Sequence, residues 1–193
     1  MQNELRSNII LCGVGGQGTI LASRLLADAA MKRGAEVKTA ETIGMAQRGG
    51  SVFSHMRIGR DLHSPLIGPG CADLIIGFEP AEVIRHLPYL KEDGRAVVSD
   101  RPVMPVSAMI GAAPYPAEEV LAYLKANVKH LTLVDAARAA KELGSAKVLN
   151  VVLLGAALRS GALDLTEEEL LAAVYARVPE RFRALNEAAL RFS

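Results

Sequence analysis

The sequence predicts an α/β fold of three layers, with a mostly parallel sheet, a β-hairpin insertion and a helical C-terminal part. Short, continuous apolar runs alternate along the chain with segments whose apolar residues recur at helical spacing. This alternation is typical of βα units with buried parallel strands. Half of the 193 residues are hydrophobic although only 4% are aromatic, so a core of aliphatic side chains is expected. The length suits a single domain over residues 1–193.

The first predicted elements are a strand, a helix and a second strand. Residues 8–12 form a short apolar run that ends at glycines, as buried strands of parallel sheets do. In residues 17–33 the apolar positions recur at helical spacing, and Gly34 follows as a stop signal. Residues 36–40 predict the second strand.

A hairpin insertion is expected after the second strand. Residues 41–50 have neither helical nor strand periodicity and predict a loop. Residues 51–58 alternate, with Val52, Ser54 and their even-numbered successors on one face of a strand. A turn at 59–61 is expected to lead into a second short strand near 64–67.

The rest of the chain continues the alternation and ends in helices. Residues 101–105 contain two prolines and predict an extended crossing segment. Thr166 and Glu169 have the spacing of a capping box, which marks a helix start. The other predicted elements are strands at 73–77, 95–99 and 131–134, and helices at 80–86, 116–128, 148–158 and 179–190.

Charge and cysteine content exclude several classes of function. The 22 basic and 21 acidic residues give a net charge of +1, which does not favour nucleic-acid binding. Two cysteines, Cys12 and Cys71, cannot supply the four thiolates of an ordinary iron-sulfur cluster or of a four-cysteine zinc site, and no metal site is predicted from the histidines. The polar start and the lack of any apolar run near the roughly 18 residues of a membrane span predict a cytoplasmic protein without membrane contact.

A glycine-rich loop follows the first predicted strand. Residues 13–18 (GVGGQG) satisfy G-x-G-x-x-G between a strand and a helix, where free amides at the helix start favour an anion. The alternative is that these glycines only permit the turn and close packing. Thr19 stands where a Walker loop has lysine, so that motif is excluded. An NAD-dependent oxidoreductase is a second possible function, and Glu41 is then the acidic residue that would bind the ribose.

A second loop, residues 44–51 (GMAQRGGS), is the least generic part of the sequence. Arg48 carries a planar set of donors suited to carboxylate or phosphate, and Gln47 adds an amide. The two glycines that follow let a ligand approach the backbone. His55 and Arg57 extend a polar patch along the next strand, although a histidine on a strand is more often structural.

These two loops together resemble a known family. Residues 13–18, 44–52 (GMAQRGGSV) and 54–59 (SHMRIG) are similar to the small subunits of the 2-oxoacid:ferredoxin oxidoreductases, the family of the pyruvate/ketoisovalerate oxidoreductase gamma domain. Within that superfamily they most resemble the indolepyruvate:ferredoxin oxidoreductase beta subunits. Further matching motifs are residues 73–74, 77–80, 101–102, 150 and 154–156.

The resemblance implies a function that needs a second chain. The complex would decarboxylate indolepyruvate or other arylpyruvates on thiamine diphosphate with Mg²⁺, pass electrons through iron-sulfur clusters to ferredoxin, and transfer the acyl group to coenzyme A. A large subunit would hold thiamine diphosphate and the clusters, so the isolated chain is expected to be inactive and to bind no cofactor alone. A non-catalytic docking subunit is a further alternative.

The resemblance also places a binding site between the two subunits, without assigning a catalytic residue to this chain. Arg48 and loop amides would neutralise a phosphate or carboxylate of coenzyme A or substrate. The candidate binding residues are Gly13, Gly15, Gly16, Gln17, Gly18, Gln47, Arg48, Gly49, Gly50 and His55.

Two further residues, Cys12 and Asn150, have both a structural and a functional interpretation. Cys12 precedes a helix start, where a thiolate would be stabilised, but a small buried hydrophobe is the more common role. Asn150 interrupts an apolar helix and, if buried, needs a hydrogen-bond partner. An anchor to the glycine loop and a ligand contact are both open for it.

Overall fold

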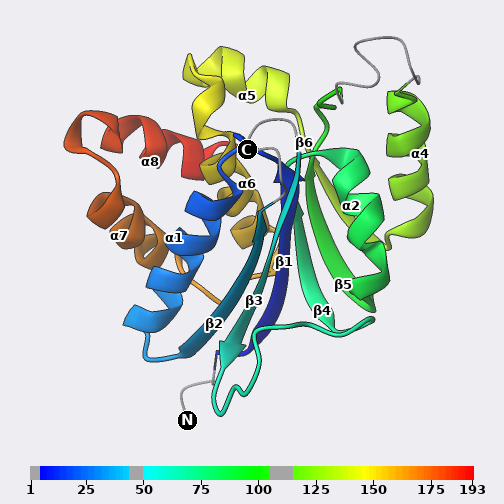
Figure 1. Cartoon of the computed structure of the whole chain (residues 1–193). Coiled ribbons are helices and arrows are strands. Elements are labelled where there is room, and N and C mark those ends of the chain that lie inside the picture. Colours follow the sequence, from blue (N-terminus) through cyan, green and yellow to red (C-terminus); the bar gives the residue numbers. More distant parts are fainter. Residues whose placement is uncertain (1–4, 44–49, 105–114) are drawn as a thin grey trace.

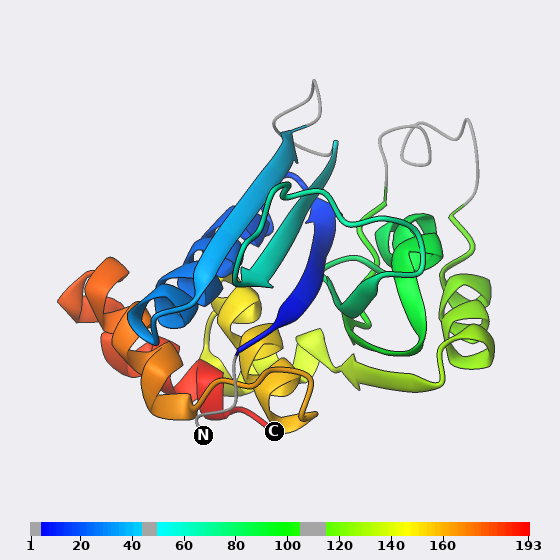
Figure 2. The same cartoon turned by 90° about the horizontal axis from the view of Figure 1, so that it is seen from below.

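The computed structural model describes residues 5–43, 50–104 and 115–193 and has the three layers that the sequence predicts. A six-stranded sheet in the order β2-β3-β1-β4-β5-β6 forms the middle layer. Helices α1, α6, α7 and α8 lie on one side of it, and α2 and α4 lie on the other (Figures 1 and 2). No helix of the described residues is long and apolar enough to cross a membrane.

Four strands form the parallel part of the sheet. β1 (Ser7–Val14) pairs with β4 (Ala72–Gly77), which pairs with β5 (Leu90–Ser99), and β5 pairs with β6 (His130–Val134). All residues of β1 from Ile9 onward are buried, because helices cover both faces of the sheet. Each predicted apolar run lies within its strand; β1 extends beyond its run at both ends, and β4, β5 and β6 begin before theirs.

The hairpin exists, but its strands differ from those predicted. β3 (Ser51–Gly59) is antiparallel to β2 (Glu36–Ile43) on one side and to β1 on the other. The predicted strand at 64–67 is wrong, since those residues form no strand. β3 has no free edge left to pair with them, because β1 and β2 occupy both of its edges.

The helices α1 (Thr19–Lys32), α6 (Leu149–Arg159), α7 (Glu167–Arg177) and α8 (Arg183–Arg191) enclose the larger core. α6 is buried nearly throughout, as its almost uninterrupted apolar sequence predicts. The capping box at the start of α7 is present, with Thr166 and Glu169 each accepting a hydrogen bond from the other's backbone amide. α8 begins later than predicted, because residues 180–182 form a separate 3₁₀ turn.

The opposite face carries a smaller core under α2 (Pro80–His86), a 3₁₀ turn (Leu87–Tyr89) and α4 (Ala117–Asn127). Pro80 occupies the first turn of α2, where its missing amide costs nothing. Val83 and Leu124 pack there against strand residues such as Ile10.

Helix α5 (Ala136–Leu143) lies in the C-terminal part that was expected to be helical, but it was not predicted as a separate helix. Asp135 caps its start by accepting a hydrogen bond from the Arg138 amide at 2.8 Å, and Gly144 ends it with a φ of 68°. Both are standard helix boundary signals. A short 3₁₀ turn (Ala146–Val148) then connects α5 to α6.

Helix α6 packs closely on the C-terminal segment at Gly155. A Cβ built on Gly155 would lie 1.9 Å from the carbonyl oxygen of Leu190. We therefore expect Gly155→Ala to lower the free energy of unfolding by about 1–3 kcal/mol, as overpacking does, although helix propensity alone would stabilise the variant by about 1 kcal/mol. Urea denaturation of the parent and the variant measures whether the free energy of unfolding falls or rises.

The matched control is Gly68→Ala, where the new Cβ would only meet Cys71 Sγ at 3.8 Å. Its stability should stay within about 0.5 kcal/mol of the parent. A Gly155→Ala variant more stable than the parent would contradict the packing described for α6.

Candidate functional site

The glycine loop lies at the carboxyl edge of the sheet, between β1 and α1. Gly16 and Gly18 have φ values of 100° and 85°, in the region that favours glycine. At Gly13 a glycine is required by close packing instead, since a Cβ there would lie 2.7 Å from Phe78 Cβ. The motif therefore encodes backbone conformation at two positions and close packing on the segment after β4 at a third.

Gln17 holds this loop to its neighbours. Its Oε1 accepts a hydrogen bond from the Val14 amide at 2.7 Å, and its Nε2 donates to the Phe78 carbonyl at 2.9 Å. The Phe78 amide in turn donates to the Cys12 carbonyl at 2.8 Å. One side chain thus closes the glycine turn and joins it to the segment that follows β4.

The glycine loop also contacts the end of the second loop. The Gly15 amide donates to the Gly50 carbonyl at 2.9 Å. The candidate residues of 13–18 and Gly50 are therefore brought together. Gln47, Arg48 and Gly49 lie outside the described residues.

The geometry argues against the dinucleotide alternative. In such a site the amide and α-carbon of the second glycine face the pyrophosphate, but here Gly50 occupies the amide of Gly15. Glu41 is exposed on β2 and paired with Ser54 of β3. Because β3 separates β2 from β1, Glu41 is displaced from β1 by two strand spacings, about 10 Å.

His55 lies away from the loops, in the middle of β3. His55 is paired with Ile10 of β1 and lies four residues, or about 13 Å, along β3 from Ser51 at the loop end of the strand. Its ring is buried, contacts the rings of Phe53 and Tyr89, and accepts a hydrogen bond from the Ile67 amide at Nδ1, 3.1 Å away. Burial, with a smaller effect of His86, lowers the pKa of His55. This is the geometry of a neutral structural histidine, and its place in the inter-subunit site stays a prediction.

Two buried glutamates near the glycine loop were missed as site residues. Glu79 is 2% exposed and Glu82 is 7% exposed. Glu79 follows Phe78 directly, and its Oε2 accepts the Glu82 amide at 2.9 Å, which caps α2. Glu82 accepts a hydrogen bond from Ser51 Oγ at 2.5 Å. Glu79 belongs to the family motif at residues 77–80 and stands beside a proline at a helix start, but neither signal predicts burial.

Cys12 has the environment of a small buried hydrophobe, and Asn150 is buried with a hydrogen-bond partner. Cys12 is fully buried, and desolvation together with the Glu82 and Glu79 carboxylates raises the pKa of its thiol. Asn150 is buried beside the glycine loop, where a Cβ on Gly18 would lie 2.9 Å from its Nδ2. Its Oδ1 accepts the Val151 amide at 3.0 Å. In the described ranges no cluster of histidine, cysteine and carboxylate side chains could hold a metal ion.

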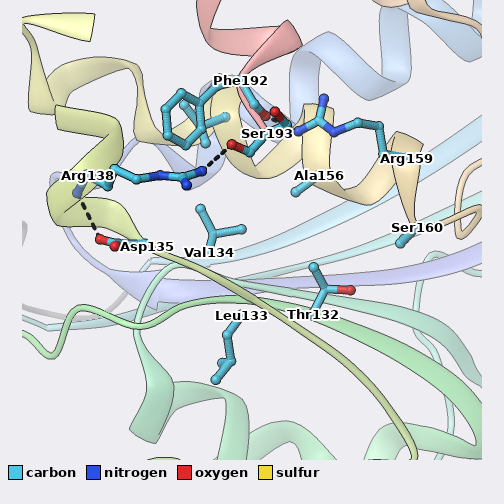
Figure 3. Close-up of a pocket in the computed structure, with 11 residues that line it drawn as sticks. Thr132, Leu133, Val134, Asp135, Arg138, Ala156, Arg159, Ser160, Phe192 and Ser193 are labelled. Carbon is cyan, nitrogen blue, oxygen red and sulfur yellow. Dashed lines mark hydrogen bonds between the residues drawn. The ribbon is translucent and has the colours of Figure 1, made fainter. Parts of the chain in front are cut away.

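A cleft of about 510 Å³ lies elsewhere, between β6, α6 and the last residues of the chain (Figure 3). Arg138 and Arg159 line this cleft, but their guanidinium groups donate hydrogen bonds to main-chain oxygens. Arg159 donates to Leu190 at 2.8 Å and to Phe192, and Arg138 donates to Ser193. These arginines therefore attach the C-terminal segment to the domain.

A second hollow of about 280 Å³ adjoins the contact of Asn150 with the glycine loop. Its lining is mainly apolar and comes from the start of α1, the segment 145–150 before and at the start of α6, and the chain from the end of α7 into α8. Leu21 is 36% exposed and Phe182 is 42% exposed. This apolar groove was not predicted from the sequence; it is formed by Leu21, Val148, Val178, Pro179, Phe182 and Leu185.

Comparison with known proteins defines the class. A family model described as pyruvate ferredoxin/flavodoxin oxidoreductase matches residues 8–192. The chain therefore belongs to this family. The crystal structure of a keto/oxoacid ferredoxin oxidoreductase gamma subunit from Geobacter sulfurreducens is similar, with a TM-score of 0.67, 26% identity, and coverage of 96% of this chain and 95% of that one.

Curated relatives narrow the position within the family. Indolepyruvate oxidoreductase subunit IorB of Archaeoglobus fulgidus is 43% identical over 78% of this chain and 75% of its own length. The IorB of Pyrococcus horikoshii is 37% identical over 93% and 90%. The common gamma subunit of the pyruvate/ketoisovalerate oxidoreductases of Pyrococcus abyssi is 30% identical over 78% and 76%. The chain is thus a small subunit of a 2-oxoacid:ferredoxin oxidoreductase, and the resemblance drawn from its two loops is confirmed.

The environment of His55 predicts a pH dependence of stability. An unfolded histidine has a pKa near 6.5, and the folded pKa of His55 is lower. Its contribution is therefore complete above about pH 6.5 and is lost as the pH falls toward the folded pKa. His55→Gln keeps an acceptor for the Ile67 amide but does not titrate, so the free energy of unfolding should fall less between pH 7.5 and pH 5 in this variant.

Urea denaturation at several pH values tests the His55 prediction, with His63→Gln as the control because His63 is exposed. The control should keep the pH dependence of the parent. Equal pH dependence in the parent and His55→Gln would show that His55 is not held neutral.

Proposed function

We propose that this chain and a large subunit together convert indolepyruvate, or a related arylpyruvate, into its acyl-coenzyme A ester. The 2-oxoacid loses carbon dioxide, the acyl group passes to the coenzyme A thiol, and the released electrons pass to ferredoxin. One observation carries the substrate assignment. The four IorB relatives are 36–43% identical to the chain, whereas the pyruvate/ketoisovalerate gamma subunits are 28–30% identical.

The cofactors would be divided unequally between the two chains. Thiamine diphosphate, Mg²⁺ and the iron-sulfur clusters are assigned to the large subunit. Two cysteines cannot ligate an ordinary cluster, and they lie at different places: Cys12 is buried and Cys71 is exposed. The small subunit therefore contributes binding and orientation to chemistry that takes place on the partner's cofactors.

The carboxyl edge of the sheet is the proposed inter-subunit site. Open α/β sheets bind ligands outside the carboxyl ends of their strands, and the glycine loop and Gly50 meet there. The first turn of α1 contains no acidic residue, so the positive end of its dipole stays available to an anion. We assign Gln47, Arg48, Gly49 and Gly50 to the same site, with Arg48 as the cation for a phosphate or carboxylate.

The apolar groove supports a partner on this side of the molecule. It adjoins the glycine loop through Asn150 and Gly18. Leu21 and Phe182 expose apolar surface there, and such surface grouped in a hollow often marks an interaction site. A large subunit bound at the glycine loop would extend over this groove.

The substrate assignment predicts the outcome of an assay with both subunits. After co-expression and co-purification with the large subunit, ferredoxin-linked activity should be greatest with indolepyruvate or phenylpyruvate and lower with pyruvate and 2-oxoglutarate. The isolated chain should be inactive, because the reacting cofactors lie on the partner. Greater activity with pyruvate would contradict the substrate, and failure to recruit a thiamine-dependent partner would contradict the whole assignment.

Arg48 is expected to bind an anionic group of coenzyme A or of the 2-oxoacid. Arg48→Ala should raise the KM for one of them by about 10- to 100-fold, because a charge-assisted hydrogen bond contributes about 1.5–3 kcal/mol. Its thermal unfolding should match that of the parent. Arg24→Ala removes the same charge from an exposed position on α1 and serves as the control. Unchanged KM values in an active Arg48→Ala complex would leave docking of the large subunit as the role of this loop.

A further inference from the structure

The two buried glutamates join four chain segments that meet at the carboxyl edge of the sheet. Glu79 Oε1 accepts hydrogen bonds from the Val103 amide at 3.4 Å and from the Tyr115 hydroxyl. Val103 follows β5 and Tyr115 precedes α4. A single carboxylate oxygen therefore holds both ends of the connection between this strand and this helix.

The second glutamate extends the network toward the glycine loop. Glu82 accepts the Ser51 hydroxyl at 2.5 Å, and Ser51 is the first residue of β3. The preceding residue, Gly50, accepts the Gly15 amide. The glycine loop, the start of β3, the start of α2 and the connection after β5 are thus linked through a few hydrogen bonds.

In the part of the chain that the structure describes, Arg85 is the one cation paired with these two glutamates. Arg85 lies 3.5 Å from Glu82, but its side chain is 70% exposed, so solvent screens this pair. The other partners described above are amides and hydroxyls. Burial and the nearby glutamates raise the pKa of both Tyr115 and Cys12. Tyr115 consequently stays a hydroxyl donor to Glu79 at neutral pH.

We propose that Glu79 and Glu82 are positioning residues for the inter-subunit site, with Tyr115 and Ser51 as the contacts through which they act. This inference rests on the proposed function. The carboxylates are buried below the surface that would meet a ligand, and they act by fixing the segments that carry binding groups. A site whose supporting side chains are locked in place binds more tightly, because less order remains to be imposed on binding.

Tyr115→Phe tests the proposal without removing a buried carboxylate. It deletes the hydrogen bond to Glu79 and leaves the α2 cap intact. In the complex with the large subunit we expect the KM for coenzyme A or for the 2-oxoacid to rise about three- to tenfold, with kcat changed less than twofold. Ser51→Ala, which breaks the contact with Glu82, should raise the same KM.

Tyr175→Phe is the matched control, because Tyr175 also donates its hydroxyl to a glutamate, Glu187, but within the C-terminal helices. It should leave both KM values unchanged while its midpoint of thermal unfolding falls by an amount comparable to Tyr115→Phe. If neither KM changes more in Tyr115→Phe than in Tyr175→Phe, the positioning role is refuted and the proposed function stands. An inactive parent complex refutes the proposed function, and this inference with it.

Discussion

The antiparallel pairing of β3 with β1 determines the arrangement of the whole carboxyl edge. The ladder runs from Ser7 opposite Ile58 to Val14 opposite Ser51, so β3 begins where β1 ends. Gly50 is thereby placed beside Gly15, and the second loop is attached to the glycine loop. The same insertion moves β2 one strand further out, which separates Glu41 from the position it needs in a dinucleotide site. One change of strand order thus converts a nucleotide-binding arrangement into one in which two loops meet.

The electrostatics of this edge impose a division of labour on its residues. The positive end of α1 and the loop amides favour an anion, yet Glu79 and Glu82 lie close behind the glycine loop and are almost fully buried. Buried carboxylates act over a longer range than exposed ones, because solvent screens them less. An anion bound at this edge would therefore need a cation of its own, the role that the proposed function gives to Arg48. Glu79 itself accepts hydrogen bonds from the backbone amides of Val103 and Glu82 and so holds these segments in place.

Sequence patterns were sufficient for the sheet, most helices and the family, because apolar periodicity and glycine spacing are local signals. They failed where a non-local contact decides the outcome. Residues 64–67 have the composition of a strand, but Arg57 donates to the Ser64 carbonyl and His55 accepts from the Ile67 amide, so side chains replace the ladder. α5 is an exception, because its ends carry the local signals Asp135 and Gly144, yet no separate helix was predicted there. Glu79 and Glu82 could not be recognised as buried, since their partners at 51, 103 and 115 are distant in sequence.

A binding site shared between two chains requires few reactive groups from each subunit. A ligand bound at a junction of two chains needs only part of its contacts from each, and orientation alone contributes several kcal/mol to a bimolecular step. This chain offers a rigid edge, since Gln17, Glu79 and Glu82 fix each segment by hydrogen bonds to backbone or side-chain donors and acceptors. The apolar groove beside that edge exposes Leu21 and Phe182. Burial of this apolar surface by a partner would stabilise the association. Hydrogen-bonded loops at the edge and association with a partner are therefore complementary requirements of the proposed inter-subunit site.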